Sequence, residues 1–411
     1  MNAFTILFVT AVLLSLVIRQ WLATRQINHI VARRATVPDS FAASISLPSH
    51  QKAADYSVAK TRLGRVELMY DTALLLAWTL GGGFALLDAL WAPLGWSPIV
   101  TGVAVMMSFF FLTSLLDVPF AAWMTFGLES RFGFNHTNAA TFFGDLVKQA
   151  LLLLLIGTPL IALVLWLMHA SGSYWWLYVW LVWVGFSLLM MWAYPAVIAP
   201  LFNKFTPLED NELRTRIESL LSRCGFTSEG IYIMDGSRRS GHGNAYFTGL
   251  GRHKRIVFFD TLLNALEPDE IEAVLAHELG HFKHKHVQKR LAAMILMSLG
   301  GMALLGWLVD QPAFYSGLGV SEPSLHMALL LFMVAAPVFA MFLQPVFSRL
   351  SRKHEFEADN FAAEQTAARH LINALVKLYR DNASTLTPDP LYSAFHDSHP
   401  PAPVRVANLS R

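Results

Sequence analysis

The chain has 411 residues, of which 54% are hydrophobic and only 15% are charged. An average soluble domain has about 25% charged residues, so this composition argues against a soluble protein and indicates that lipid surrounds much of the chain. The net charge of +2 gives no sign of nucleic-acid binding. The single cysteine, Cys224, excludes a disulfide framework and a multi-cysteine zinc site, so any metal must be held by His, Asp or Glu.

Seven apolar runs have the length of about 20 residues that a membrane-spanning helix needs. The first run has no basic segment before it and no small-residue cleavage signal after it, so we expect a retained span rather than a signal peptide. The predicted spans are residues 3–22, 66–90, 98–123, 147–169, 174–198, 291–309 and 325–347.

The distribution of Lys and Arg gives an orientation. The connections after the first, third and fifth spans and the tail after the seventh are basic, whereas the other connections have no Lys or Arg. By the positive-inside rule, we expect the N-terminus outside, and residues 203–290 and the C-terminal tail in the cytoplasm.

Residues 203–290 read as a soluble insertion. Residues 209–223 have the apolar spacing of a helix, and two short strand-like runs follow at 230–234 and 255–259. A helix is expected from about Pro268, with acidic residues at its start, continuing directly into the sixth span. After the seventh span, residues 355–381 are again expected to be helical.

The predicted helix after Pro268 contains an H-E-x-x-H motif, formed by His277, Glu278 and His281. Residues four apart face the same side of a helix, so both imidazoles can reach one ion. Glu278 lies about 100° round the helix from His277, close enough to take a proton from metal-bound water without being a ligand.

A catalytic zinc needs a third protein ligand, and Glu355 and Asp359 follow the seventh span on one helical face. A hairpin of the sixth and seventh spans would return these acids to the membrane boundary from which the His helix enters. Two nearby histidines receive other interpretations. His284 is expected to be a charge partner at the helix C-terminus, and His286 a polar residue near the membrane surface.

Several motifs together resemble the type 1 CAAX prenyl proteases, which are membrane zinc peptidases of the gluzincin kind. The resemblance covers essentially the whole chain, in order. The segments that carry it are residues 133–135, 194–195, 200–205, 234–240, 244–247, 277–281, 355–359 and 398–401, together with Arg405.

The resemblance implies that His277, His281 and Glu355 bind one Zn²⁺ ion and that Glu278 is the general base. Asp359 would be a second catalytic residue, oriented on a ligand imidazole or donating a proton. The substrate-binding residues would be Asn244, Ala245, Tyr246 and Phe247, which present a strand edge to the peptide, and His399 and Arg405, which reach back to the site.

We therefore expect a mainly α, polytopic membrane protein with about seven transmembrane helices. The resemblance implies that these helices form a chamber, capped by a cytoplasmic metallopeptidase domain with a small β element. The predicted division is residues 1–200 for the first five spans, 201–290 for the metallopeptidase domain, 291–347 for the last two spans, and 348–411 for a helical segment that completes the active site.

The family's substrate is a protein or peptide with a lipidated C-terminal Cys, cut just after that Cys. A tail without an ER-retrieval signal favours a bacterial inner membrane over an ER membrane, with the active site on the cytoplasmic side. The alternatives are a general quality-control metalloprotease of the membrane, an intramembrane protease of the site-2 type, and a binding or transport protein with a structural metal.

Overall fold

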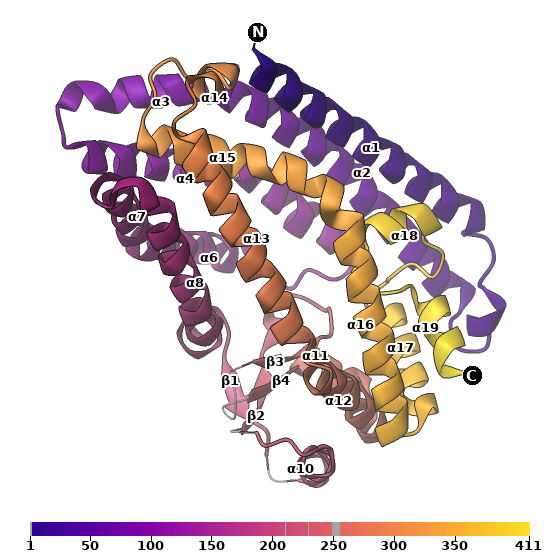
Figure 1. Ribbon diagram of the computed structural model, residues 1–411. Helices are drawn as coiled ribbons and strands as arrows, with labels where there is room; N and C mark the ends of the chain where they lie inside the picture. Colours follow the sequence, from indigo (N-terminus) through magenta and orange to yellow (C-terminus); the bar gives the residue numbers. More distant parts are fainter. Residues whose placement is uncertain (1, 210, 229, 249–254) are drawn as a thin grey trace.

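The computed structural model describes residues 2–209, 211–228, 230–248 and 255–411. Long helices dominate one end of the molecule, and a small sheet with α10 (Glu212–Cys224) and α12 (Pro268–Lys283) forms the other (Figure 1). The apolar runs of the sequence thus lie apart from its polar insertion.

The described residues contain six helical segments long and apolar enough to cross a membrane, or seven if a bent pair counts as one span. Each predicted span has a counterpart, and most observed segments extend beyond the predicted ends because the flanking polar residues remain helical. The six segments are Ala3–Arg33, Pro98–Phe132, Ala139–Ala170, Gly172–Phe202, His286–Leu308 and Leu325–Gln365.

The bent pair corresponds to the predicted span 66–90. It consists of α2 (Leu47–Trp78) and the stretch Gly83–Leu94, whose axes differ by 51°. Gly82 lies between them with φ +80°, a conformation that glycine adopts without the clash a side chain brings. The prediction of one continuous helix here is wrong.

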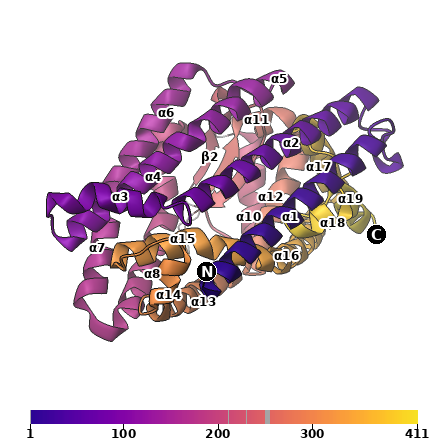
Figure 2. The ribbon, with the colours of Figure 1, turned by 90° about the horizontal axis from the view of Figure 1, so that it is seen from above.

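The long helices form a closed circuit of neighbours. Each helix contacts the next one in the order α1, α2, α3, α4, α7, α8, α13 and α15, and α15 in turn contacts α1. Seen from above, these helices surround the middle of the molecule (Figure 2). Only 6% of the most apolar window of Gly172–Phe202 is buried within the chain, so its apolar side chains suit contact with lipid. The circuit comprises α1 (Ala3–Arg33), α2, α3 (Gly83–Trp91), α4 (Pro98–Ala122), α7 (Thr158–Ala170), α8 (Trp175–Ala193), α13 (His286–Leu308) and α15 (Leu325–Ala340).

The sheet has four strands in the order β1-β2-β4-β3. The predicted strands are confirmed as β2 (Gly230–Met234) and β4 (Arg255–Phe259), which pair in parallel. On the outer sides, β1 (Phe205–Pro207) pairs antiparallel with β2 and β3 (Ala245–Thr248) antiparallel with β4. Strand β3 is therefore an edge strand.

Helix α12 does not run into the sixth span, contrary to the prediction. It ends at Lys283, and α13 begins at His286 after Lys285, which has φ +58°. A left-handed residue cannot continue a right-handed helix, so the chain changes direction there. As expected, His284 lies at the helix end, where its N–H bonds to the Gly280 carbonyl.

The C-terminal region is helical, as predicted, with a break at Thr366 and Ala367. Helix α15 continues through a short 3₁₀ turn into α16 (Gln344–Gln365), so Glu355 and Asp359 belong to the helix that leaves the membrane. The remaining helices of the described chain are α5 (Ser130–Phe132), α6 (Ala139–Leu152), α9 (Ala199–Phe202), α11 (Asp260–Ala265), α14 (Pro312–Gly317), α17 (Ala368–Asp381), α18 (Pro390–His396) and α19 (Ala402–Leu409).

Candidate metal centre

Helices α12 and α16 pack unusually closely where the site forms. A Cβ added to Gly280 would lie only 2.8 Å from the Cα of Ala358. The absence of a side chain at Gly280 therefore allows the two backbones to approach. This contact sets the His residues of α12 against the Glu of α16.

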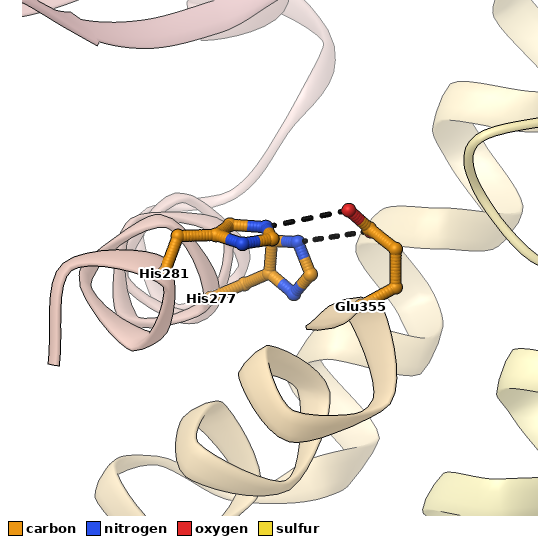
Figure 3. A group of neighbouring side chains, drawn as sticks. All are labelled: His277, His281 and Glu355. Carbon is orange, nitrogen blue, oxygen red and sulfur yellow. Dashed lines mark ion pairs between the residues drawn. The ribbon is translucent and has the colours of Figure 1, made fainter. Parts of the chain in front are cut away.

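His277 and His281 project from α12 toward Glu355 on α16 (Figure 3). The Nε2 atom of His277 lies 3.4 Å from Glu355 Oε2, and the Nε2 atom of His281 lies 3.4 Å from Glu355 Oε1. One ligand atom from each of the three residues falls within 4.8 Å of the others. Three nitrogen or oxygen donors thus converge on one point.

The residues present fit a bound metal ion. Glu355 is only 3% exposed, and among the described residues its Oε2 atom has no hydrogen-bond partner. A buried carboxylate oxygen without a partner is unfavourable unless a cation satisfies it. Two imidazoles and one carboxylate are a ligand set of catalytic zinc sites, which keep a fourth position open.

Asp359 lies behind His277, away from Glu355. Its Oδ1 atom lies 2.8 Å from His277 Nδ1. Burial lowers the pKa of His277, but the Asp359 and Glu355 carboxylates outweigh it and raise this pKa to about 9. A metal ligand must be neutral, so metal binding has to displace a proton from His277 near neutral pH.

Arg405, on α19, forms hydrogen bonds with both carboxylate oxygens of Asp359. Its Nε donates to Asp359 Oδ2 at 2.9 Å, its Nη2 donates to Asp359 Oδ1, and its Nη1 lies 3.8 Å from Glu355 Oε2. Arg405 is 6% exposed and Asp359 is fully buried. This position suits the support of Asp359 better than direct contact with a peptide.

Glu278 lies next to the cluster on α12 and is partly buried. Among the described residues, its carboxylate makes no hydrogen bond or ion pair. It therefore keeps its acceptor capacity for a molecule bound at the site.

The remaining predicted residues lie beside Glu355 or along the edge strand β3. The Nε2 atom of exposed His399 lies 3.4 Å from Glu355 Oε1. Asn244 directly precedes β3, the edge strand formed by Ala245 to Thr248, and the Phe247 ring contacts that of Phe282 on α12 at 5.3 Å between centroids. The edge of the sheet is thus tied to the His helix.

Sequence reasoning missed the contact that His286 makes with the site, where its side chain is only 2% exposed. Its Nδ1 lies 3.0 Å from Nδ1 of His281, and its Nε2 lies 2.8 Å from Glu357 Oε2. If His281 binds a metal through Nε2, its Nδ1–H donates to His286, and His286 must then donate its Nε2–H to Glu357. The two residues thus fix the tautomer and orientation of His281.

His286 also forms a second candidate metal cluster, with His354 and Glu357. Their ligand atoms approach within 4.8 Å, but the His286 and His354 rings are stacked with centroids 4.0 Å apart. In the hydrogen-bonded arrangement above, both His286 nitrogens are engaged. A second ion there would compete with the ordering of His281.

Three of the segments quoted for the resemblance meet at the junction of the membrane helices and the sheet. Arg239 pairs with Asp145 at 2.9 Å and donates to Asn203 at 3.0 Å, and Asn135 forms an isolated bridge with Ser240. These motifs therefore join the two parts of the molecule.

The fold and the site define an integral-membrane metallopeptidase. The family model "CAAX prenyl protease N-terminal, five membrane helices" matches residues 26–204, and the model "Peptidase family M48" matches residues 207–411. The chain therefore belongs to the type 1 CAAX prenyl protease family, within peptidase family M48.

Individual relatives agree over most of the length. The chain is 34% identical to a CAAX prenyl protease 1 homolog of Arabidopsis thaliana, over 94% of this chain and 92% of that protein. It is 37% identical to CAAX prenyl protease 1 of Saccharomyces cerevisiae, over 72% and 69%. The crystal structure of S. mikatae Ste24p superposes with a TM-score of 0.92 at 30% identity, covering 100% of this chain and 99% of that one.

Proposed function

We propose that this metallopeptidase is a zinc endopeptidase that cuts a protein or peptide just after a lipidated cysteine near its C-terminus. The observation that carries the proposal is the convergence of His277, His281 and Glu355 on one point, close to the start of the spanning helix α13 and within the polar end of the spanning segment Leu325–Gln365. Relatives named CAAX prenyl protease 1 support the substrate class. A site at the membrane boundary suits a substrate whose lipid is held in the bilayer.

In this proposal His277, His281 and Glu355 hold the zinc ion. When bound, the ion would supply Lewis-acid polarisation of the scissile carbonyl and activation of a water molecule. Asp359 keeps the Nδ1–H of His277 directed toward itself, so that Nε2 faces the site. Arg405 neutralises Asp359 and holds it in place.

Glu278 accepts the proton of the attacking water and returns it to the leaving amine. The free edge of β3, from Asn244 to Phe247, binds the extended peptide as an added strand. His399, next to Glu355, would contact the substrate or the oxyanion. Together these residues provide binding, proton transfer and charge stabilisation around one point.

We further propose that the domain boundaries follow the division predicted from the sequence, with the site facing the cytoplasm. A bacterial inner membrane is preferred to an ER membrane. The basic connections between alternate spans support this orientation. We propose no nucleic-acid partner.

The proposal is tested with a farnesylated peptide ending in Cys-aliphatic-aliphatic-X and its unlipidated twin. Wild type, Glu278→Gln and chelator-treated protein are compared. We expect the wild type to cut only the lipidated peptide and both controls to be inactive. Metal-dependent cleavage of both peptides would instead assign a general quality-control protease, and cleavage of neither would contradict the proposed activity.

A further inference from the structure

A positively charged cavity of about 400 Å³ lies beside the candidate metal centre, between α1, α2, α18 and the π-helical segment Trp123–Glu129 that continues α4. Arg19 from α1 and Lys60 and Arg65 from α2 line it, together with one carboxylate, Glu67. None of the residues assigned so far to metal binding, proton transfer or substrate binding belongs to its lining.

Arg19 is the single charged residue in the first predicted span. A charged side chain within a spanning helix is unfavourable unless it faces a water-filled cavity or a partner. Arg19 lines this cavity, and Asp71 on α2 lies within electrostatic range of it. The cavity therefore explains how the first span accommodates an arginine.

The three cations keep donor capacity for a ligand. Arg65 Nε donates to Gln20 Oε1 at 2.7 Å, and Lys60 Nζ lies 5.9 Å from the centre of the Tyr56 ring. Neither these two nor Arg19 forms an ion pair with a carboxylate in the part of the chain that the structure describes. With three cations against Glu67, the lining has an excess of positive charge.

The cavity lies within a short reach of the metal centre. His396 lines it at the C-terminal end of α18, and three residues further on His399 lies against Glu355. Three residues of extended chain span at most about 10 Å. Hydrogen bonds from Ser348 to the Phe395 carbonyl and from Arg352 to the Asp397 carbonyl fix the end of α18 on α16.

His396 does not add to the charge of the cavity. Burial and the neighbouring Arg19 cation lower the pKa of His396 to about 4, so its imidazole is neutral near neutral pH. Tyr392, one turn earlier on α18, also lines the cavity. Helix α18 thus contributes neutral groups to the lining, and the cations come from α1 and α2.

We propose that Arg19, Lys60 and Arg65 bind the free C-terminal carboxylate of the peptide substrate. This inference rests on the proposed function, in which three residues follow the scissile bond. Those three residues also span about 10 Å when extended, and the three residues from His396 to His399 set the same upper limit on the separation of cavity and metal centre. Arginine side chains bind carboxylates through paired, charge-assisted hydrogen bonds. The cavity would therefore select substrates whose C-terminal carboxylate lies three residues after the scissile bond.

The test compares two farnesylated peptides of identical sequence, one with a free C-terminal acid and one with a C-terminal amide. The full-length protein in uncharged detergent is used for wild type, Arg19→Gln and Arg65→Gln. We expect wild type to cut the acid about 10–100-fold more efficiently in kcat/KM than the amide, mainly through KM, because a hydrogen-bonded charge contact is lost. Each variant should reduce this acid-to-amide ratio toward one.

Arg62→Gln is the matched control, because Arg62 is an exposed cation on the same helix that does not line the cavity. It should leave the ratio unchanged. Equal cleavage of acid and amide by wild type would overturn the inference while leaving the proposed function intact. If the variants lost activity equally on both peptides, the cations would have a structural role and the inference would be overturned. If the acid were preferred over the amide only after phosphatidylglycerol was added, the cavity would bind a lipid headgroup, which would also overturn the inference. If wild type cut neither peptide, the proposed function would itself fail.

Discussion

Helices α8 and α16 have similar lengths, 19 and 22 residues, but only α16 has carboxylates among its buried side chains. The buried residues of α8 are Trp175 and Val179, and its other apolar side chains are exposed or only partly buried. Helix α16 buries Glu355 and Asp359 against α12. The comparison teaches that apolar exposure marks the lipid-facing surface of α8, whereas the buried charges of α16 belong to the site. Substitutions on the α12–α16 pair should therefore affect metal binding or catalysis far more than matched substitutions on spanning helices.

The largest effect is expected for Glu278→Gln. Removing a general base lowers the rate by about 10²–10⁴-fold, and Glu278 is not one of the three converging donors. We therefore expect kcat to fall by this factor while the metal content stays at the wild-type level. Steady-state kinetics with elemental analysis on the same sample measure both, and retained turnover would contradict the assigned role.

Replacing His286 should weaken metal binding without removing a ligand. His286→Ala deletes the group that orders His281, and such changes typically weaken metal affinity by about 10–100-fold. Competition with a fluorescent chelator measures the dissociation constant. His284→Ala is the matched control, since His284 is exposed at the end of α12. Equal affinity in wild type and His286→Ala would show that the contact does not tune the site.

The close approach of α12 and α16 is tested by Gly280→Ala. The new methyl group meets the Ala358 backbone, and such overpacking destabilises by about 1–3 kcal/mol. We expect a lower thermal unfolding midpoint in detergent and a lower metal content. Gly300→Ala on spanning α13 is the control, because no atom lies within 4 Å of the added Cβ. An equal response of the two variants would contradict the comparison between the helix pair and the spanning helices.

The smallest expected effect, taken per pH unit, is the pH dependence of metal affinity. The metal-free protein has a His277 pKa raised to about 9, whereas a ligand imidazole must be neutral. Below pH 9 binding displaces one proton, so the apparent affinity should rise about tenfold for each pH unit from 7 toward 9 and then level off. Titrations in metal buffers test this, and a flat profile from pH 7 to 9 would be inconsistent with the His277–Asp359 pair.

The sequence predicted most of what depends on local periodicity. The i, i+4 spacing of His277 and His281 brings both Nε2 atoms to the same glutamate, and both strand runs form with the predicted bounds. The hairpin argument also placed Glu355 opposite the histidines, because two apolar spans of similar length must return the chain to the same boundary.

Features that depend on one residue's conformation or on distant segments were not predictable. Lys285 adopts a left-handed conformation that nothing in its residue type requires, and this turn ends α12 and directs His286 toward His281. The pairing of Arg239 with Asp145 joins residues 94 apart in sequence. The cavity around Arg19 needs three helices and α18 to be placed together. Such contacts follow from the packing of the whole fold.

The most direct test of the central claim is the zinc content of purified wild type, Glu278→Gln and Glu355→Ala after dialysis against a weak chelator. A single ion held by His277, His281 and Glu355 predicts one zinc per chain in wild type and in Glu278→Gln, and close to none in Glu355→Ala that still elutes as folded protein. Equal zinc in Glu355→Ala and wild type would contradict the assigned site.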